Sequence, residues 1–381
     1  MVLALAIAGA VIWVGLLLAP WRPWSTAERL ESAAHSAGPK ADLSLITVLV
    51  PARDEATLIG RTIGALVGQG EGLAIVVVDD QSTDDTAEFA RQAGGDRCTV
   101  ISGTPVPAGW TGKLWALEQG RTRVRTRLTL LIDADIELRP GILPMLQQRL
   151  RAEERQLVSL MAMLEMRSGW EKLLVPAFVF FFKLLYPFRV SNSRRRLVAA
   201  AAGGCVLIET AILAQIGGFG ALRYELIDDC ALARCVKASG GRTWIGLTHG
   251  VISHRRMDGL GDIWRMVERS AYAQLRFSPT LLAACVALLA IAFLAPPMTI
   301  VVGNGGARVL AAATMLAMWT TYLPTLRFYG RSPLWAPLLP LTGALYMLMT
   351  VNSALRHWRG VGSVWKGRRY VGMRAVESGP L

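Results

Sequence analysis

Short apolar runs alternate with helix-like segments between residues 43 and 138. Four of these runs are predicted to be strands, and the last of them has the length and composition of a strand buried on both faces. They are Leu45–Val50, Ala74–Val78, Thr99–Ser102 and Leu128–Ile132. The intervening residues 55–67 and 114–120 carry apolar side chains at helical spacing. This alternation predicts an α/β fold, with a mostly parallel sheet and helices on both faces. Pro51 has no N–H and is expected to end the pairing of the first strand.

Four long stretches carry no charged side chain and are candidates for membrane segments. They are Met1–Trp21, Phe277–Ala307, Val309–Leu326 and Ser332–Leu355. A helix of about 20 apolar residues crosses a bilayer core. The first stretch lacks a basic start and a small-residue cleavage site, so it is expected to be an anchor.

These segments divide the chain into a soluble part held between membrane parts. The expected organisation is an anchor at 1–21, a linker at 22–42, a soluble α/β domain at 43–276, membrane segments at 277–355 and a basic tail at 356–381. Arg22 and Arg29 follow the first segment, and by the positive-inside rule the α/β domain is therefore expected in the cytoplasm.

The side of the membrane on which the tail lies is left open by the sequence. Three later spans would place it outside, whereas six basic residues and one acid in 355–381 favour the inside. Pro296 and Pro297 are expected to break the first late segment, and three further prolines interrupt the last. Either one late segment is re-entrant or interfacial, or one is not a span, and the last segment is the one expected to lie partly along the membrane surface.

Aromatic residues gather at 170–190, between basic residues and prolines. This segment fits either a helix in the membrane interface or an ordinary buried helix. The net charge is +13 and the mean hydropathy is +0.38, and basic residues cluster beside the apolar segments. That distribution favours an anionic lipid surface over nucleic acid as the partner. Five cysteines without a C-x-x-C pair argue against a disulfide framework or a zinc site.

Carboxylates follow the predicted strands. Asp133 and Asp135 leave one strand on the same side of the pleat, where two hard oxygen ligands suit Mg²⁺ or Mn²⁺. The other acids that follow strands or precede a helix are Glu55, Asp79, Asp80, Asp228 and Asp229. Each alone could be a helix cap or a solvated turn residue. At the carboxyl edge of a parallel sheet, however, they would gather where such sheets bind ligands.

Five segments together resemble the motifs of family 2 glycosyltransferases with the GT-A (Rossmann-like) fold. They are Pro51–Glu55, similar to P-x-x-N-E; Asp79–Asp84, similar to D-D-x-S-x-D; Lys113–Gly120, similar to K-x-x-A-L-x-x-G; Asp133–Asp135 as D-x-D; and Asp228–Leu232, similar to E-D-x-x-L. Asp54 stands where the family usually has Asn, and Asp228 where it has Glu. The ending Trp365–Tyr370 is similar to the tail of bacterial lipid-linked members, and the hopanoid-biosynthesis-associated group is the nearest suggested match.

The resemblance implies an inverting, metal-dependent transferase for a nucleotide sugar, UDP- or GDP-linked. Asp229 would be the catalytic base, and Asp228 would raise its pKa by like-charge repulsion. Asp135 with Asp133 would hold the metal. The donor would be bound by Pro51, Glu55, Asp79, Asp80, Lys113 and Asp133.

A membrane lipid, with a hopanoid as one candidate, is the implied acceptor, and the bacterial inner membrane is the implied location, with several spans. A polyprenyl-phosphate sugar transferase or a polysaccharide synthase is the alternative enzyme. A membrane scaffold with an inactive transferase domain is the alternative outside enzymes. His249 and His254 are assigned no role.

Overall fold

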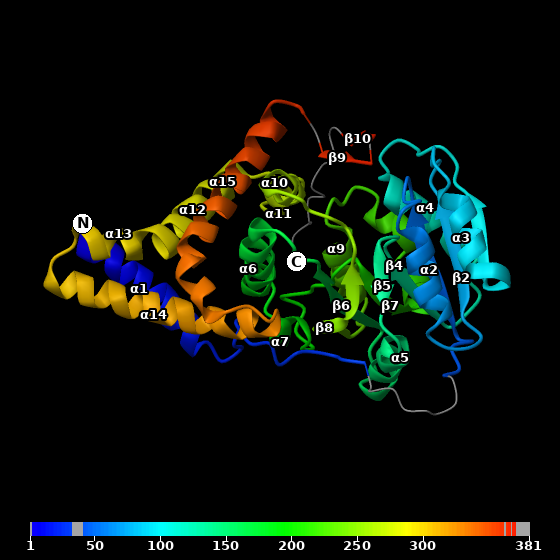
Figure 1. Ribbon diagram of the computed structural model, residues 1–381, viewed down its shortest axis with the longest axis horizontal. Coiled ribbons are helices and arrows are strands. Elements are labelled where there is room, and N and C mark those ends of the chain that lie inside the picture. The colour runs from blue at the N-terminus through cyan, green and yellow to red at the C-terminus, as the bar shows by residue number, and fades with distance from the viewer. Residues whose placement is uncertain (1, 33–40, 362, 367, 371–381) are drawn as a thin grey trace. The chain divides into compact units, whose positions relative to one another are not determined.

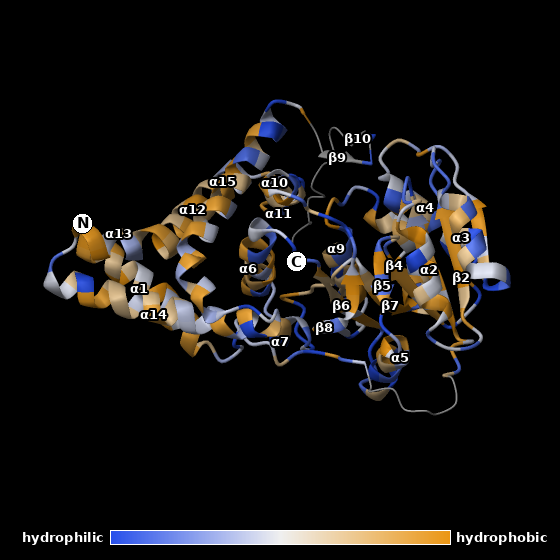
Figure 2. Ribbon diagram, viewed as in Figure 1, coloured by the Kyte–Doolittle hydropathy of each residue, from blue (hydrophilic) through white to orange (hydrophobic). Residues whose placement is uncertain are grey.

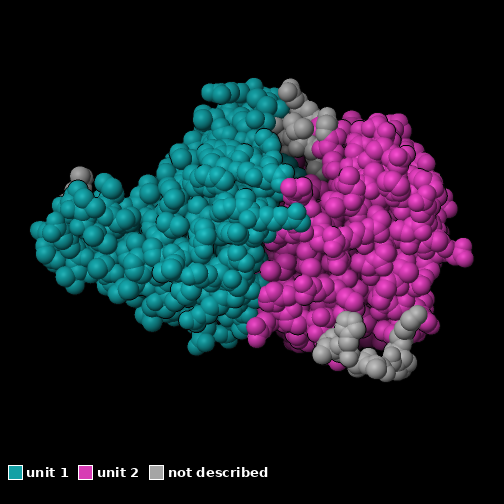
Figure 3. All heavy atoms as spheres, viewed as in Figure 1, with its two compact units in different colours: residues 1–27, 166–189, 257–364 teal, residues 28–165, 190–256, 365–381 magenta. Residues whose placement is uncertain are grey.

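The computed structural model describes residues 2–32, 41–361, 363–366 and 368–370. The chain forms two compact units, each assembled from separate stretches (Figure 3). Unit 1 comprises 1–27, 166–189 and 257–364, and unit 2 comprises 28–165, 190–256 and 365–381. The two units interleave along the chain. The domain limits expected from the sequence stay predictions.

Unit 2 is built on an eight-stranded sheet of order β3-β2-β1-β4-β7-β6-β8-β5 (Figure 1). The strands are β1 (Ile46–Ala52), β2 (Ala74–Asp79), β3 (Cys98–Ser102), β4 (Leu128–Ile132), β5 (Ile136–Leu138), β6 (Leu157–Leu164), β7 (Cys205–Glu209) and β8 (Thr243–Ser253). Strands β1 to β4 pair in parallel, as do β6 and β8, whereas β7 runs antiparallel to both its neighbours and β5 to β8. The predicted, mostly parallel α/β sheet is confirmed.

Helices cover both faces of this sheet. On one face lie α2 (Ile59–Val67), α3 (Thr86–Gly94) and α5 (Ile142–Ala152), with the side chains of Val48 and Val50 beneath them. The opposite face packs α4 (Gly112–Arg121), α8 (Thr210–Gln215) and α9 (Asp228–Ala238) over Leu49 and its neighbours. Successive residues of β1 thus enter opposite cores, which explains why the strand reads as an unbroken apolar run.

Pro51 does not end β1, contrary to the prediction. The ladder with β2 continues to the pair Ala52–Asp79, whereas the ladder with β4 stops at the pair Leu49–Leu131. The carbonyl of Ala52 accepts a hydrogen bond from Asp80 on the β2 side, so Pro51 faces the β4 side. A missing N–H costs nothing there, because that ladder has already ended.

Unit 1 is helical, and its longer helices are predominantly apolar (Figure 2). Its helices are α1 (Val2–Leu18), α6 (Gly169–Leu185), α10 (Leu260–Glu268), α11 (Ala271–Gln274), α12 (Pro279–Leu289), α13 (Ala295–Val302), α14 (Gly305–Phe328) and α15 (Leu339–Trp358). Among the described residues, three helices could cross a membrane by length and composition: Pro279–Val302, Gly305–Phe328 and Pro333–Trp358. The described residues also form shorter elements elsewhere in the chain. These are helix α7 (Phe188–Ser191), 3-10 turns at 95–97, 218–222 and 333–338, and a two-stranded sheet of β9 (Ser363–Trp365) and β10 (Arg368–Tyr370).

Pro296 and Pro297 do not break the first of these helices. A π-helical stretch, Ala290–Leu294, joins α12 to α13, and the two prolines fall in the first turn of α13. The helix continues through the two prolines to Val302, with this wider turn just before them. The expectation that the last segment lies partly along the membrane surface stays a prediction.

Helix α1 packs within unit 1 against α14 and α13. Its Trp13 is fully buried and donates its indole N–H to the carbonyl of Ala292 at 2.7 Å. The 17-residue helix falls within the predicted anchor but is shorter than the three candidate spans.

The aromatic segment forms helix α6, which packs on α14 and α15 of the same unit. Phe180 contacts Tyr322 edge to face, Phe181 contacts Tyr346 in the same way, and the Tyr346 hydroxyl donates to the Leu174 carbonyl at 3.0 Å. The helix therefore has a buried face, and whether it lies in the membrane interface stays a prediction.

Candidate active site

The carboxyl ends of three neighbouring parallel strands meet at one edge of the unit 2 sheet. Register places Ala52, the last residue of β1, opposite Asp79, the last residue of β2. Strand β4 pairs with β1 in the same direction and runs directly into Asp133. The acids expected after these strands therefore share one edge, as the sequence predicted.

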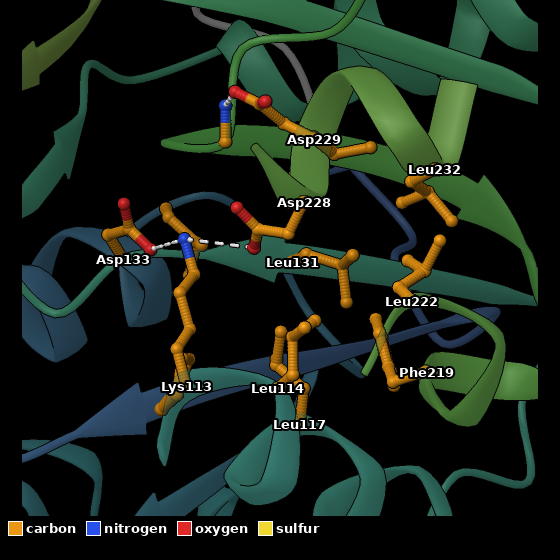
Figure 4. A pocket seen from close by; sticks show the side chains of 14 residues that line it. Lys113, Leu114, Leu117, Leu131, Asp133, Phe219, Leu222, Asp228, Asp229 and Leu232 are labelled. Atoms are coloured by element: carbon orange, nitrogen blue, oxygen red, sulfur yellow. Dashed lines mark hydrogen bonds and ion pairs between the residues drawn. The ribbon is translucent and has the colours of Figure 1, made fainter. Parts of the chain in front are cut away.

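A pocket opens at this edge and contains five of the predicted site residues: Pro51, Lys113, Asp133, Asp228 and Asp229. Lys113 enters it from the first turn of α4, where Thr111 caps the helix by accepting from the backbone N–H of Leu114. Its ammonium lies 2.7 Å from Asp133 Oδ1 and 3.8 Å from Asp228 Oδ2, the two contacts dashed in Figure 4. One lysine thus links the end of β4 to the start of α9.

Charges around this lysine oppose the effect of burial. Burial would lower the pKa of Lys113, but the nearby carboxylates of Asp133, Asp228 and Asp229 hold it well above its usual value. Burial raises the pKa of Asp133, Lys113 opposes that rise, and the charges of Asp135 and Asp228 add to it. The pocket therefore holds one fixed positive charge among several acids that are held close together at a desolvation cost.

Asp229 is a further carboxylate of the pocket, and its pKa is raised. Burial, and then the charge of Asp228, raise its pKa to about 6. Two backbone N–H groups limit the rise: Gly203 donates to Oδ2 at 2.8 Å, and Cys230 donates to Oδ1 at 2.7 Å. A side-chain Cβ at Gly203 would lie 3.4 Å from both Asp229 Oδ2 and Lys113 Nζ, so the glycine leaves this space to the two charged groups. A base of this pKa is largely deprotonated at neutral pH yet can accept a proton.

The D-x-D carboxylates meet two different cations. Asp133 faces Lys113, whereas the buried Asp135 accepts from the Ser253 hydroxyl at 2.7 Å and from Arg255 Nε at 3.3 Å. Asp135 does not line the pocket that contains Asp229. It nevertheless influences the pKa of Asp133, so the two carboxylates lie within electrostatic reach of each other.

This pair offers the hard oxygen donors that Mg²⁺ and Mn²⁺ prefer. Among the residues that the structure describes, no three His, Cys, Asp or Glu side chains form a cage for a metal ion. An ion held by Asp133 and Asp135 would therefore take its remaining ligands from water and phosphate oxygens, which is how Mg²⁺ commonly binds beside a diphosphate. The donor set fits the expected metal.

Glu55 and Asp80 lie at the ends of β1 and β2 and are both buried. Glu55 pairs with Arg255 at 3.1 Å and with Lys366 at 2.7 Å, while Asp80 pairs with Arg368. Burial raises the pKa of both carboxyl groups, and these cations oppose the rise. Asp79 differs, since its Oδ1 accepts the backbone N–H of Ser82 at 3.3 Å and shapes the turn after β2.

A family model described as "Glycosyltransferase like family 2" matches residues 43–256, the part of the chain that carries this site. The chain belongs to this family. Among curated proteins, it is 34% identical over 91 residues to a 4,4'-diaponeurosporenoate glycosyltransferase from Staphylococcus aureus, a match that spans 24% of each protein.

Among solved structures, this family 2 chain is similar to a mannosyltransferase from Pyrobaculum calidifontis in complex with GDP-Man and Mn²⁺. The TM-score is 0.56 with 19% identity, over 91% of this chain and 99% of that one. At this identity the likeness shows the fold, which is GT-A. Neither relative identifies the hopanoid-associated group.

Several charged and polar residues at this site were not predicted. Arg255 bridges Glu55 and Asp135, Ser253 donates to Asp135, and Arg53 donates to the carbonyl of Asp80 at 2.6 Å. Arg255 is the second residue after the end of β8, so a basic residue close to a strand end was the available signal. The sequence shows a basic tail, but nothing in it indicates which acids Lys366 and Arg368 contact.

His254 also has defined partners, although the sequence assigned it no role. Its ring nitrogens lie 2.7 Å from Glu165 Oε1 and 2.7 Å from Glu137 Oε2, and its backbone N–H donates to the carbonyl of Asp135. These contacts hold the turn after β4 against the end of β8. His249 pairs with Glu31 at 2.7 Å, away from the pocket residues.

Proposed function

We propose that this chain is a membrane-bound inverting glycosyltransferase that moves a sugar from a nucleotide-sugar donor to a lipid acceptor. The observation that carries the proposal is the pocket at the carboxyl edge of a GT-A sheet, where Lys113 lies among Asp133, Asp228 and Asp229. Such a constellation provides a cation for a diphosphate and a base for an acceptor within one cavity.

Asp229 is the proposed base. It accepts the proton of the acceptor hydroxyl as that oxygen forms its bond to the anomeric carbon, while the bond to the nucleoside diphosphate breaks on the opposite side. A single carboxylate suffices, because inversion needs no covalent sugar intermediate. The products are the glycosylated lipid and the free nucleoside diphosphate, with the proton left on Asp229.

Lys113 supplies positive charge to the diphosphate as it departs, and its contact with Asp133 keeps the ammonium in place before the donor binds. Asp133 and Asp135 would hold Mg²⁺ or Mn²⁺, which when bound neutralises charge on the leaving group. Glu55, Asp79 and Asp80 are proposed to accept hydrogen bonds from the nucleoside, and Pro51 lines the pocket beside it.

A lipid acceptor is supported by the composition of unit 1 and by one relative. Three described helices are long and apolar enough to cross a membrane. The Staphylococcus aureus relative is named for 4,4'-diaponeurosporenoate as the compound that it glycosylates. We place the catalytic domain on the cytoplasmic side of a bacterial inner membrane, with an anionic lipid surface as a partner and a hopanoid-related lipid as one acceptor to test.

The test uses the full chain in detergent with UDP-glucose, UDP-N-acetylglucosamine and GDP-mannose, a bacterial lipid extract and Mn²⁺. Release of nucleoside diphosphate and transfer of labelled sugar into lipid are both measured. Asp229→Asn is expected to lower the transfer rate about 10²- to 10⁴-fold, the usual worth of a general base, and Asp135→Ala to abolish it. Glu154→Gln, an exposed change on the same unit, is the control. Equal turnover in the wild type and both site variants would refute these roles.

A further inference from the structure

Two basic side chains from the end of the chain contact the two buried acids that follow β1 and β2. Lys366 Nζ lies 2.7 Å from Glu55 Oε1 and donates to the Asp54 carbonyl at 3.1 Å. Arg368 pairs with Asp80 and donates to Gln81 Oε1 at 2.8 Å. Lys366 and Arg368, called the tail pair below, therefore belong to unit 2 although they follow the last apolar helix in sequence.

The contacts extend to the backbone of the strand ends. Arg53 donates through Nε to the carbonyl of Lys366 at 3.3 Å and through Nη1 to the carbonyl of Asp80 at 2.6 Å. A residue of the β1 end thus holds both the tail and the β2 end. This connection makes the tail pair part of the site and distinguishes it from charged residues that merely lie on the surface.

One buried acceptor is left without a partner after these contacts are made. The Asp80 side chain is 1% exposed, and its Oδ2 takes the contact with Arg368. Its Oδ1 has no hydrogen-bond partner among the described residues. A buried acceptor without a donor is unfavourable, so the position calls for an N–H or O–H group that the protein does not supply. The imide N–H of a nucleobase is such a group.

The cations around Glu55 and Asp80 suit the phosphate end of a nucleotide. Arg53, Arg255, Lys366 and Arg368 all contact the ends of β1 and β2 or their carboxylates. Guanidinium groups bind phosphate through paired hydrogen bonds, and an ammonium binds it as a point charge. A nucleoside diphosphate brings neutral donors for the acids and negative charge for the cations. It could therefore exchange partners with the existing ion pairs: the carboxylates would keep hydrogen-bond donors, and the cations would meet the phosphate charge.

We propose that Lys366 and Arg368 are donor-binding residues: they neutralise Glu55 and Asp80 in the empty site and transfer to the diphosphate when a nucleotide sugar binds. The proposal rests on the proposed function, because it assumes a nucleoside-diphosphate donor at this sheet edge. The alternative to donor binding is that Lys366 and Arg368 only block the site. In that case removal of the tail pair would strengthen nucleotide binding.

Affinity measurements on the full chain in detergent separate these cases. UDP, GDP, uridine and guanosine are titrated calorimetrically in the presence of Mn²⁺ against the wild type, Lys366→Ala, Arg368→Ala and Arg368→Lys. Each alanine variant is expected to weaken binding of the preferred diphosphate about tenfold or more, since a hydrogen bond to a charged group is lost. Binding of the matching nucleoside should change less than twofold or become tighter, because it carries no phosphate.

Two controls keep the outcome clear. Arg359→Ala removes a positive charge from an exposed position between α15 and the tail pair, and it should leave the diphosphate affinity within about twofold. Arg368→Lys keeps the charge but loses the planar fork, and it should fall between the wild type and Arg368→Ala. This conservative variant also reports on the pair if an alanine variant fails to fold.

The possible failures are distinguishable. If the wild type binds neither UDP nor GDP and transfers no sugar, the proposed function itself is wrong. If the wild type binds and turns over a donor, but the alanine variants bind the diphosphate as tightly as the wild type or more tightly, only the role of the tail pair is overturned.

Discussion

The charge of Asp228 should determine where the acidic limb of the pH–rate profile falls. Asp229 has a pKa of about 6, against an ordinary value of 3.8, because it is buried and because Asp228 stands beside it. Asp228→Asn keeps the size of the neighbour and removes its charge. The burial of Asp229, its two backbone donors and its attraction to Lys113 all remain, so the pKa of Asp229 should fall.

The magnitude follows from these causes. A pKa of about 6 corresponds to about 3 kcal/mol in favour of the protonated form, at 1.36 kcal/mol for each pH unit. Burial is the larger cause and Asp228 the second. We therefore assign about one pH unit to Asp228, roughly 1.4 kcal/mol. At pH 5 the deprotonated fraction of Asp229 would rise from about one tenth to about one half, a gain of about fivefold.

The direction of the pH effect follows because Asp229, as the proposed base, must be deprotonated to act. Wild-type activity should fall as the pH drops through about 6, and the variant should retain activity to lower pH. The measurement is kcat/KM for sugar transfer between about pH 4.5 and pH 8, with each profile normalised to its own plateau. Normalisation matters because Asp228 also lies 3.8 Å from Lys113, and its loss can change the plateau rate.

Glu154→Gln serves as the matched control, since it removes one carboxylate at an exposed position of the same unit. Its limb should coincide with that of the wild type. A limb for Asp228→Asn at the wild-type pH, or at higher pH, would show that Asp228 does not raise the pKa of Asp229, the proposed base.

Two further outcomes follow from single contacts. Ser253→Ala removes the hydroxyl that donates to Asp135. It should raise the half-saturating Mn²⁺ concentration at least tenfold, the usual cost of losing such a supporting contact. An unchanged metal titration would contradict a role for Asp135 in holding the ion. Gly94→Ala should lower the free energy of unfolding by about 1–3 kcal/mol, since its Cβ would lie 2.1 Å from Cys98 Cβ. The control is Gly60→Ala, which has open space around it and should be neutral or stabilising by up to about 1 kcal/mol. Thermal unfolding in detergent measures both glycine variants, and equal losses would show that the contact with Cys98 is not limiting.

The apolar runs predicted the first four strands of the sheet well. Strands β1, β2 and β4 are buried on both faces and need no alternation, whereas the edge strand β3 is only partly buried. The observed β1 and β2 extend the predicted runs by one or two residues only. Strand order was beyond the reach of the pattern. Strand β7 inserts antiparallel between β4 and β6, and hydropathy states neither the direction of a strand nor its neighbours.

The site was predictable where its residues follow strands or begin helices. Lys113, Asp133 and Asp229 lie in one pocket, as the spacing of their elements suggested. The cations that face Glu55 and Asp80 were not predictable, since they are brought there from about 200 to 310 residues away in sequence. Contacts of that separation arise from tertiary packing and leave no local signal.

Arg255 is shared between Asp135, which follows β4, and Glu55, which follows β1. If Asp135 held a metal ion, Arg255 would share that carboxylate with the ion and would be more available to a phosphate. The occupancy of the ion and that of the nucleotide would then be thermodynamically linked through a single side chain. Such linkage is reciprocal, so whatever factor the ion contributes to nucleotide affinity, the nucleotide returns to the ion.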